Sequence, residues 1–74
     1  MVEVSARDAQ PRAQSALANS PIYELRDLRV EQQNGALLIC GVVSSFYHKQ
    51  LAQEVVRTVC QELQVELVNS IRVR

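Results

Sequence analysis

Several hallmarks of common functional classes are scarce or missing in this sequence. Gly35 and Gly41 are its only glycines, so no glycine-rich loop is available to cradle a phosphate group. Eight Lys and Arg residues are balanced by eight Asp and Glu residues, which leaves no basic surplus for nonspecific nucleic-acid binding. No apolar run approaches the roughly 18 residues of a membrane-spanning helix. We therefore expect no phosphate-binding loop, no nucleic-acid partner and no membrane span.

Cysteine and histidine are also scarce, and their spacing argues against a reactive site. Cys40, Cys60 and the only histidine, His48, match no zinc-ligand pattern. We expect both cysteines to be free thiols, and His48 to cap or pack at the start of a helix. A nucleophilic Cys–His pair needs side-chain contact, but Cys60 follows His48 by twelve residues on one predicted helix, roughly 18 Å along its axis. We predict no catalytic residue, no metal ligand and no cofactor.

The length of 74 residues limits the chain to one domain. A chain this short buries only about 60% of the surface that its unfolded form exposes, which excludes multidomain enzymes, barrels and complete Rossmann folds. We predict a flexible N-terminus over residues 1–8 and a single domain over residues 9–74. The N-terminus lacks the basic start and apolar stretch of a secretory signal, so the expected location is cytoplasmic, with peripheral membrane attachment as an option.

Small apolar residues at helical spacing predict a first helix from Asp8 to Asn19. Asp8 can serve as its N-cap, and Pro11 then falls in the first turn, where a missing N–H is tolerated. The helix should end before Pro21, because the residue that precedes a proline avoids helical backbone angles.

Two strands joined by a tight turn are predicted next. Residues 25–33 alternate apolar and polar side chains, which is typical of a half-buried strand. Asn34 and Gly35 follow at once and predict a hairpin, because a type I′ turn needs positive φ at both central residues. Residues 36–44 then form an antiparallel second strand. Gly41 inside that strand indicates a bulge or a close approach by a neighbouring helix, so Asn34, Gly35 and Gly41 receive structural roles.

A long amphipathic helix is predicted from Phe46 to Glu62, with Ser44 and Ser45 as N-cap candidates. Its apolar stripe consists of Leu51, Ala52, Val55, Val56, Val59 and Leu63. Residues 65–73 form the third strand, which must run parallel to the second because the helix carries the chain back across the sheet. The order predicts an α+β fold: a two-layer αββαβ sandwich, in which two helices cover one face of a three-stranded mixed sheet.

The second strand is apolar on both of its faces. The side chains expected to face the helices are Leu37, Ile39 and Val43. The opposite face carries Leu38, Cys40 and Val42, where polar residues would be usual. Neighbouring strands should surround these with Arg29, Arg72 and Arg74. An apolar centre with an arginine rim indicates an interaction face.

Three explanations for this interaction face stay open. A second copy of the chain could cover it and give a homodimer or a larger homo-oligomer. An anionic phospholipid surface could meet it, with the arginines directed at head groups. The N-terminal segment could instead bury it, in which case no function follows.

Phe46 lies off the apolar stripe of its own helix and also allows two interpretations. Beside Lys49, it could anchor the chain at a membrane interface. The favoured alternative is that it packs against the turn formed by residues 21–23, because an isolated surface aromatic needs no functional explanation.

The segment from Asn34 to Ser45 resembles the signature of the BON domain family, named for bacterial osmotic-stress and nodulation proteins. The matching positions are Gly35, Leu37, Ile39, Gly41 and Val43. Residues 68–73 resemble the closing strand of that family, and Leu17 fits its first helix. Residues 20–23 and 45–50 are similar to small single-domain members from planctomycete bacteria. The resemblance covers roughly residues 12–74.

The resemblance implies an αββαβ fold, no enzymatic activity, and attachment to phospholipid membranes or to other envelope components, often in the periplasm. One cytoplasmic branch of the family binds potassium. We therefore expect a non-enzymatic binding module that associates with a phospholipid membrane or an envelope-linked partner. The alternatives are a homo-oligomeric interaction or scaffold domain without lipid binding, and a small ion-binding domain.

Overall fold

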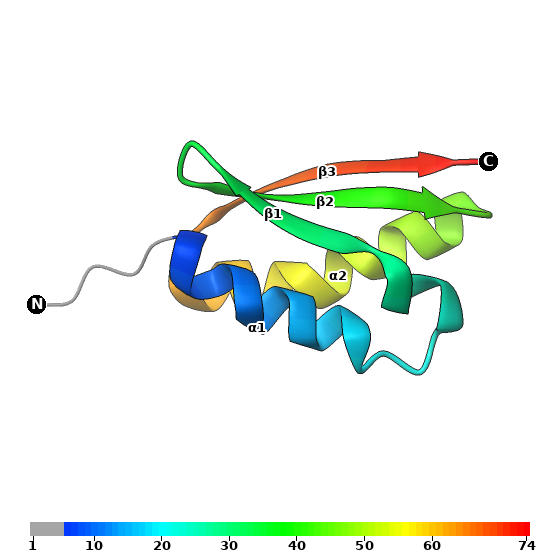
Figure 1. The fold of residues 1–74 in the computed structure, drawn as a ribbon, viewed down its shortest axis with the longest axis horizontal. Coiled ribbons are helices and arrows are strands. Elements are labelled where there is room, and N and C mark those ends of the chain that lie inside the picture. Colours follow the sequence, from blue (N-terminus) through cyan, green and yellow to red (C-terminus); the bar gives the residue numbers. More distant parts are fainter. Residues whose placement is uncertain (1–5) are drawn as a thin grey trace, which may run out of the picture.

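The computed structural model describes residues 6–74, with side chains from residue 8 onward, and has two helices on one face of a three-stranded sheet (Figure 1). The elements are α1 (Ala6–Ala18), the 3-10 helix η1 (Tyr23–Asp27), β1 (Arg29–Gln33), β2 (Ala36–Val43), α2 (Phe46–Leu63) and β3 (Glu66–Val73). The central strand β2 pairs antiparallel with β1 and parallel with β3. The predicted α+β sandwich is confirmed. Of the stretch predicted as flexible, residues 1–5 lie outside the described residues, and residues 6–8 belong to α1.

The first helix begins two residues earlier than predicted. Because α1 starts at Ala6, Asp8 lies in its first turn and is not the N-cap. Pro11 lies inside the helix, in the second turn rather than the first. A carboxylate is favourable at either place near the positive end of a helix, so composition does not separate a cap from a first-turn residue. The helix ends as predicted, and the Asn19 N–H donates to the Ser15 carbonyl.

The start of the predicted first strand is the 3-10 helix η1 instead, and β1 begins only at Arg29. Leu25 and Leu28 explain the difference, because they are three residues apart and both are buried. A helix with three residues per turn directs both side chains to the same side, whereas a strand would direct them to opposite faces. The Leu28 N–H donates to the Leu25 carbonyl and closes this turn.

Gly35 has the turn role that the pattern predicts, and Gly41 marks a close approach by another part of the chain. At the β1–β2 turn, φ is +51° at Asn34 and +81° at Gly35, and Gln33 pairs with Ala36. Gly41 has φ of +140°, and a Cβ there would lie 2.6 Å from Leu28 Cδ2. The close approach is therefore made by Leu28, between η1 and β1, and not by one of the two predicted helices.

The core lies between the helices and the inner face of the sheet. The predicted inner residues of β2, Leu37, Ile39 and Val43, have no exposed surface. The stripe of α2 is also confirmed: Ala52, Val56 and Val59 are buried, while Leu51, Val55 and Leu63 are half-buried against the core. Cys60 is buried as well, and its thiol fills a position that the stripe left out.

Glutamine side chains of α1 hold the outer edge of β1. Gln14 Nε2 donates to the Leu28 carbonyl at 2.8 Å, and its Oε1 accepts from the Val30 N–H at 2.8 Å. Gln10 Nε2 donates to the Val30 carbonyl at 2.8 Å. Backbone groups at a sheet edge need partners, and here side chains supply them. The sheet face that points away from the helices is therefore a larger exposed strand surface than the edge of β1.

Candidate interaction surface

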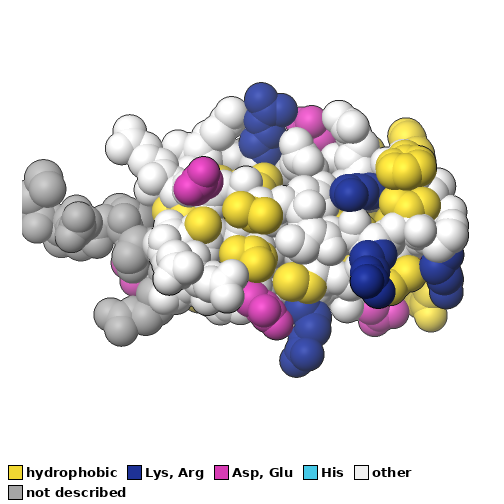
Figure 2. All heavy atoms as spheres, turned by 90° about the horizontal axis from the view of Figure 1, so that it is seen from above, with side chains coloured by type: hydrophobic (Ala, Val, Ile, Leu, Met, Phe, Trp, Pro, Cys, Tyr) yellow, Lys and Arg dark blue, Asp and Glu magenta, His cyan; other side chains and the backbone are white. Residues whose placement is uncertain are grey.

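The sheet face that points away from both helices is not covered by any element within residues 6–74 (Figures 1 and 2). Strand register and the alternation of side chains decide which residues lie on it. We call this set the outer face: Arg29, Glu31 and Gln33 of β1; Ala36, Leu38, Cys40 and Val42 of β2; Glu66, Val68, Ser70 and Arg72 of β3.

The centre of the outer face is apolar and partly exposed. Val42 is 48% exposed and Val68 is 41% exposed, while Leu38 and Cys40 are half-buried. The structure thus places all three predicted apolar residues on one face. Val68 is an addition, because it pairs with Leu38. The sequence could have indicated Val68, because alternation along β3 directs Val68 and Arg72 to the same face.

Charges on the outer face are separated by sign along the strands. Arg29 pairs with Cys40 and Arg72 pairs with Val42, so both lie toward the end where β2 finishes. Glu31 and Glu66 lie toward the hairpin. In Figure 2, most Lys and Arg side chains lie toward the right of the apolar patch, while acidic side chains lie on both sides of it. Arg29 and Arg72 therefore lie on the half of the face nearer the end of β2, and two carboxylates that the prediction left out lie on the half nearer the hairpin.

Neither thiol is activated. Burial raises the pKa of the Cys40 thiol, the Glu31 carboxylate raises it further, and Arg29 opposes them. Burial also raises the pKa of the Cys60 thiol. Both cysteines are free. Because the thiolate is the reactive form of cysteine, a raised pKa leaves both groups poor nucleophiles at neutral pH.

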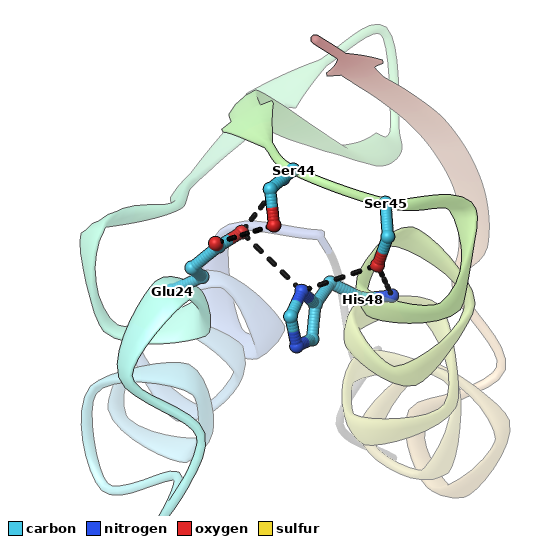
Figure 3. Close-up of polar contacts among 4 residues, drawn as sticks. All are labelled: Glu24, Ser44, Ser45 and His48. Atoms are coloured by element: carbon cyan, nitrogen blue, oxygen red, sulfur yellow. Dashed lines mark hydrogen bonds and ion pairs between the residues drawn. The ribbon is translucent and has the colours of Figure 1, made fainter.

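A polar cluster joins η1 to the start of α2 (Figure 3). Glu24 accepts hydrogen bonds from the Ser44 N–H at 2.7 Å and from Ser44 Oγ at 2.6 Å. These bonds are the main reason why the pKa of the Glu24 carboxyl lies below its ordinary value. Ser45 is the N-cap of α2 and accepts from the His48 N–H at 3.2 Å. The prediction that His48 belongs to the helix N-terminus is confirmed.

The hydroxyl, imidazole and carboxylate in this cluster are not arranged as a proton relay. Ser45 Oγ and Glu24 Oε1 each lie 3.3 Å from the same ring nitrogen, His48 Nδ1. A nucleophilic triad needs the hydroxyl and the carboxylate on opposite nitrogens of the ring. The cluster ties two segments together, and its contacts explain why Ser44 and Ser45 are both polar.

Three aromatic side chains project from the fold. Phe46 and Tyr47, the first residues of α2, are 75% and 67% exposed, and Tyr23 is 74% exposed. The expected packing of Phe46 against the turn at residues 21–23 is therefore wrong. The contact between these segments is made instead by the polar side chains of Glu24 and His48.

Two other kinds of site are absent from the described part of the chain. Within residues 6–74, no group of three or more His, Cys, Asp or Glu side chains is close enough to hold a metal ion. Within the same range, no helix combines the length and apolar character needed to cross a bilayer.

Comparison of the chain with protein-family models, with curated proteins and with solved structures found no match. The resemblance to the BON family therefore stays a prediction that rests on the glycines, the strand alternation and the closing strand of this sequence.

Proposed function

We propose that this protein is a non-catalytic binding module that attaches to anionic phospholipid surfaces by one end of the molecule. We call this the membrane end and define it as Phe46, Tyr47 and Arg74. The backbone N–H of Arg74 donates to the Val43 carbonyl at 2.9 Å, so Arg74 lies beside the segment that leads into Phe46. The observation that carries the proposal is the exposure of two adjacent aromatic residues, 75% and 67%, at the end of the molecule where the backbone of Arg74 pairs with Val43.

This combination of groups suits a membrane interface. Aromatic rings partition to the level of the lipid head groups, and arginine is attracted to anionic lipids. Such an attachment is local and salt-dependent, because the chain has no net charge and solvent ions screen exposed groups. The resemblance to the BON family supports the same class of partner.

The outer face is less suited to an anionic surface than the membrane end. Glu31 and Glu66 lie on it, and their carboxylates would be repelled by acidic lipids if the sheet lay flat on the bilayer. We therefore assign lipid contact to the membrane end alone. The absence of catalysis is part of the proposal, and it is supported by the geometry at His48 and by the raised thiol pKa values.

The test is co-sedimentation of the purified chain with anionic and with zwitterionic vesicles, at low and at high salt. We expect binding to anionic vesicles at low salt only. Arg74→Glu should weaken it more than tenfold, because the reversal changes the charge by two units and each unit near such a surface contributes about 1 kcal/mol. Phe46→Ser should also weaken it, because the ring no longer partitions among the head groups. The matched control is Arg57→Glu on the exposed side of α2, which should bind normally.

Two results would reject the proposal. One is a wild-type chain that stays in the supernatant with anionic vesicles at low salt. The other is an Arg57→Glu variant that loses as much binding as Arg74→Glu, because binding would then follow total charge and not the membrane end.

A further inference from the structure

We infer that the outer face binds a second copy of this chain in an antiparallel, two-fold arrangement. This inference goes beyond the proposed membrane function, because it concerns a different surface and a different partner. It rests on the apolar centre of the outer face and on the order of charges along its two outer strands.

The apolar centre has no partner among residues 6–74. Val42 and Val68 are nearly half-exposed, and the half-buried Leu38 and Cys40 lie between the flanking strands. A domain of 74 residues buries a limited share of its apolar surface by itself, so covering this strip stabilises it. Exposed apolar strips with charged borders are typical of protein contacts.

On β1, a negative and a positive charge follow one another along the outer face. Glu31 pairs with Leu38, and Arg29 pairs with Cys40 one step further along β2. Both charges act on the Cys40 thiol, with opposite effects on its pKa, so both lie close to the central strand.

On β3, the same order of charges occurs over a longer distance. Glu66 pairs with Ala36 near the hairpin, and Arg72 pairs with Val42 near the other end of β2. The midpoint between Glu66 and Arg72 falls at the level of Asn69, next to Ile39. The midpoint between Glu31 and Arg29 falls at Val30, which pairs with the same Ile39. Both charge pairs are therefore centred on one level of the sheet.

A single two-fold rotation pairs each of the four charged residues with an opposite charge on the second copy. The axis lies in the plane of the interface, crosses the strands at right angles and passes between Leu38 and Cys40. It reverses the strand direction while β1 stays over β1 and β3 stays over β3 of the second copy. Each Glu31 then faces an Arg29, and each Glu66 faces an Arg72. Such self-complementarity is the property that a two-fold interface requires.

These four charged groups are available for a partner. Ion pairs of the described residues join other groups, among them Arg12 with Glu62, His48 with Glu24, and Arg57 with Glu54. The described residues thus contain no ion pair that holds Arg29, Glu31, Glu66 or Arg72. A facing copy supplies opposite charges at each of these positions and steers its own orientation.

The size of the outer face predicts a weak dimer. The strands lie about 4.8 Å apart and rise about 3.3 Å per residue, so five residues of β1 and eight each of β2 and β3 cover roughly 330 Å² per copy. Stable interfaces bury about 800 Å² per partner, so this interface belongs to the weak and concentration-dependent class. We therefore expect exchange between monomer and dimer and a strong response to charge reversal.

Antiparallel pairing of two β3 edges is the competing way to bring two copies together. It would also place Glu66 beside Arg72 of the second copy. It would leave the charges of β1 unpaired and the apolar centre exposed, since β1 lies on the far side of β2 from β3. Charge reversals on β1 therefore separate the two arrangements.

The test is sedimentation velocity from about 10 to about 500 μM, the range in which a weak interface exchanges. We expect the wild-type chain to shift from monomer to dimer. Glu31→Arg and Arg29→Glu should each raise the dimer dissociation constant about tenfold or more, because like charges then face each other. An equimolar mixture of the two variants should restore association, because opposite charges meet again in the mixed dimer.

The β3 pair should behave in the same way: Glu66→Arg and Arg72→Glu fail alone and associate when mixed. The matched controls are Glu54→Arg and Arg57→Glu, which reverse an exposed pair on α2 and should leave association unchanged. Leu38→Glu should keep the wild-type circular dichroism spectrum and lose the dimer. The charge-reversal mixtures decide the question even where Leu38→Glu fails to fold.

Three outcomes overturn the inference. The first is a wild-type chain that stays monomeric to 500 μM at low salt, on the scale set for weak interfaces. The second is rescue by mixing for the β3 pair but not for the β1 pair, which assigns the contact to strand edges. The third is equal weakening by the α2 controls. Vesicle binding depends on Phe46 and Arg74, which none of these variants changes, so failure of the dimer and failure of membrane attachment are distinguishable.

Discussion

Gly35 and Gly41 show two different reasons for a glycine at positive φ. A Cβ at Gly35 would meet nothing within 4 Å, whereas one at Gly41 would lie 2.6 Å from Leu28 Cδ2. We predict that Gly35→Ala costs about 1 kcal/mol of unfolding free energy, from backbone strain alone. Gly41→Ala should cost about 2–4 kcal/mol, because overpacking against Leu28 adds to strain. Urea unfolding measures both, and equal losses would contradict the close approach.

Glu24 links stability to pH at the scale of one side chain. The hydrogen bonds from Ser44 hold its pKa below the ordinary value of 4.5 in the folded chain. A carboxyl with a lowered folded pKa stabilises the fold fully above its unfolded pKa, and this contribution is lost as the pH falls through the folded pKa. We predict that the melting temperature of the wild-type chain falls more between pH 6 and pH 3 than that of Glu24→Gln. Parallel curves for the two proteins would contradict this prediction.

At the scale of an element, α2 carries a fully buried valine next to a half-buried one. Val56 has no exposed surface, while Val55 is half-buried at the margin of the core. We predict that Val56→Ala costs about 2 kcal/mol of unfolding free energy and Val55→Ala about 1 kcal/mol, in proportion to the buried methyl groups and the cavity left behind. Chemical denaturation of both variants measures the difference. A larger loss for Val55→Ala would mean that the helix is rotated about its axis.

At the scale of the whole molecule, the two proposals together predict that the dimer links two membranes. The two-fold arrangement places the membrane ends of two copies at opposite ends of the dimer, since it reverses the direction of β2. We predict that the wild-type chain clusters anionic vesicles, as measured by light scattering. Glu31→Arg should still bind vesicles but no longer cluster them, and an equimolar mixture with Arg29→Glu should restore clustering. Clustering by Glu31→Arg alone would show that the link does not use the outer face.

The sequence by itself determined the elements whose signals are local. The hairpin follows from Asn34 and Gly35, α2 from the period of its apolar stripe, and the parallel third strand from the crossover that α2 imposes. The apolar half of the outer face was equally accessible, because alternation along β2 directs Leu38 and Val42 away from the helices.

Only the tertiary structure decided what depends on contacts between distant segments. The chain is helical at Leu25 because this conformation buries both Leu25 and Leu28 in the core. The intrinsic helix propensity of these residues does not depend on that burial. Phe46 stays exposed, and the contact between its segment and η1 is made by Glu24 with Ser44, 20 residues away. The division of charge on the outer face follows from register, which places Glu66 at one end and Arg72 at the other. Register is set by packing and turns across the whole sheet, so the sequence of one strand does not determine it.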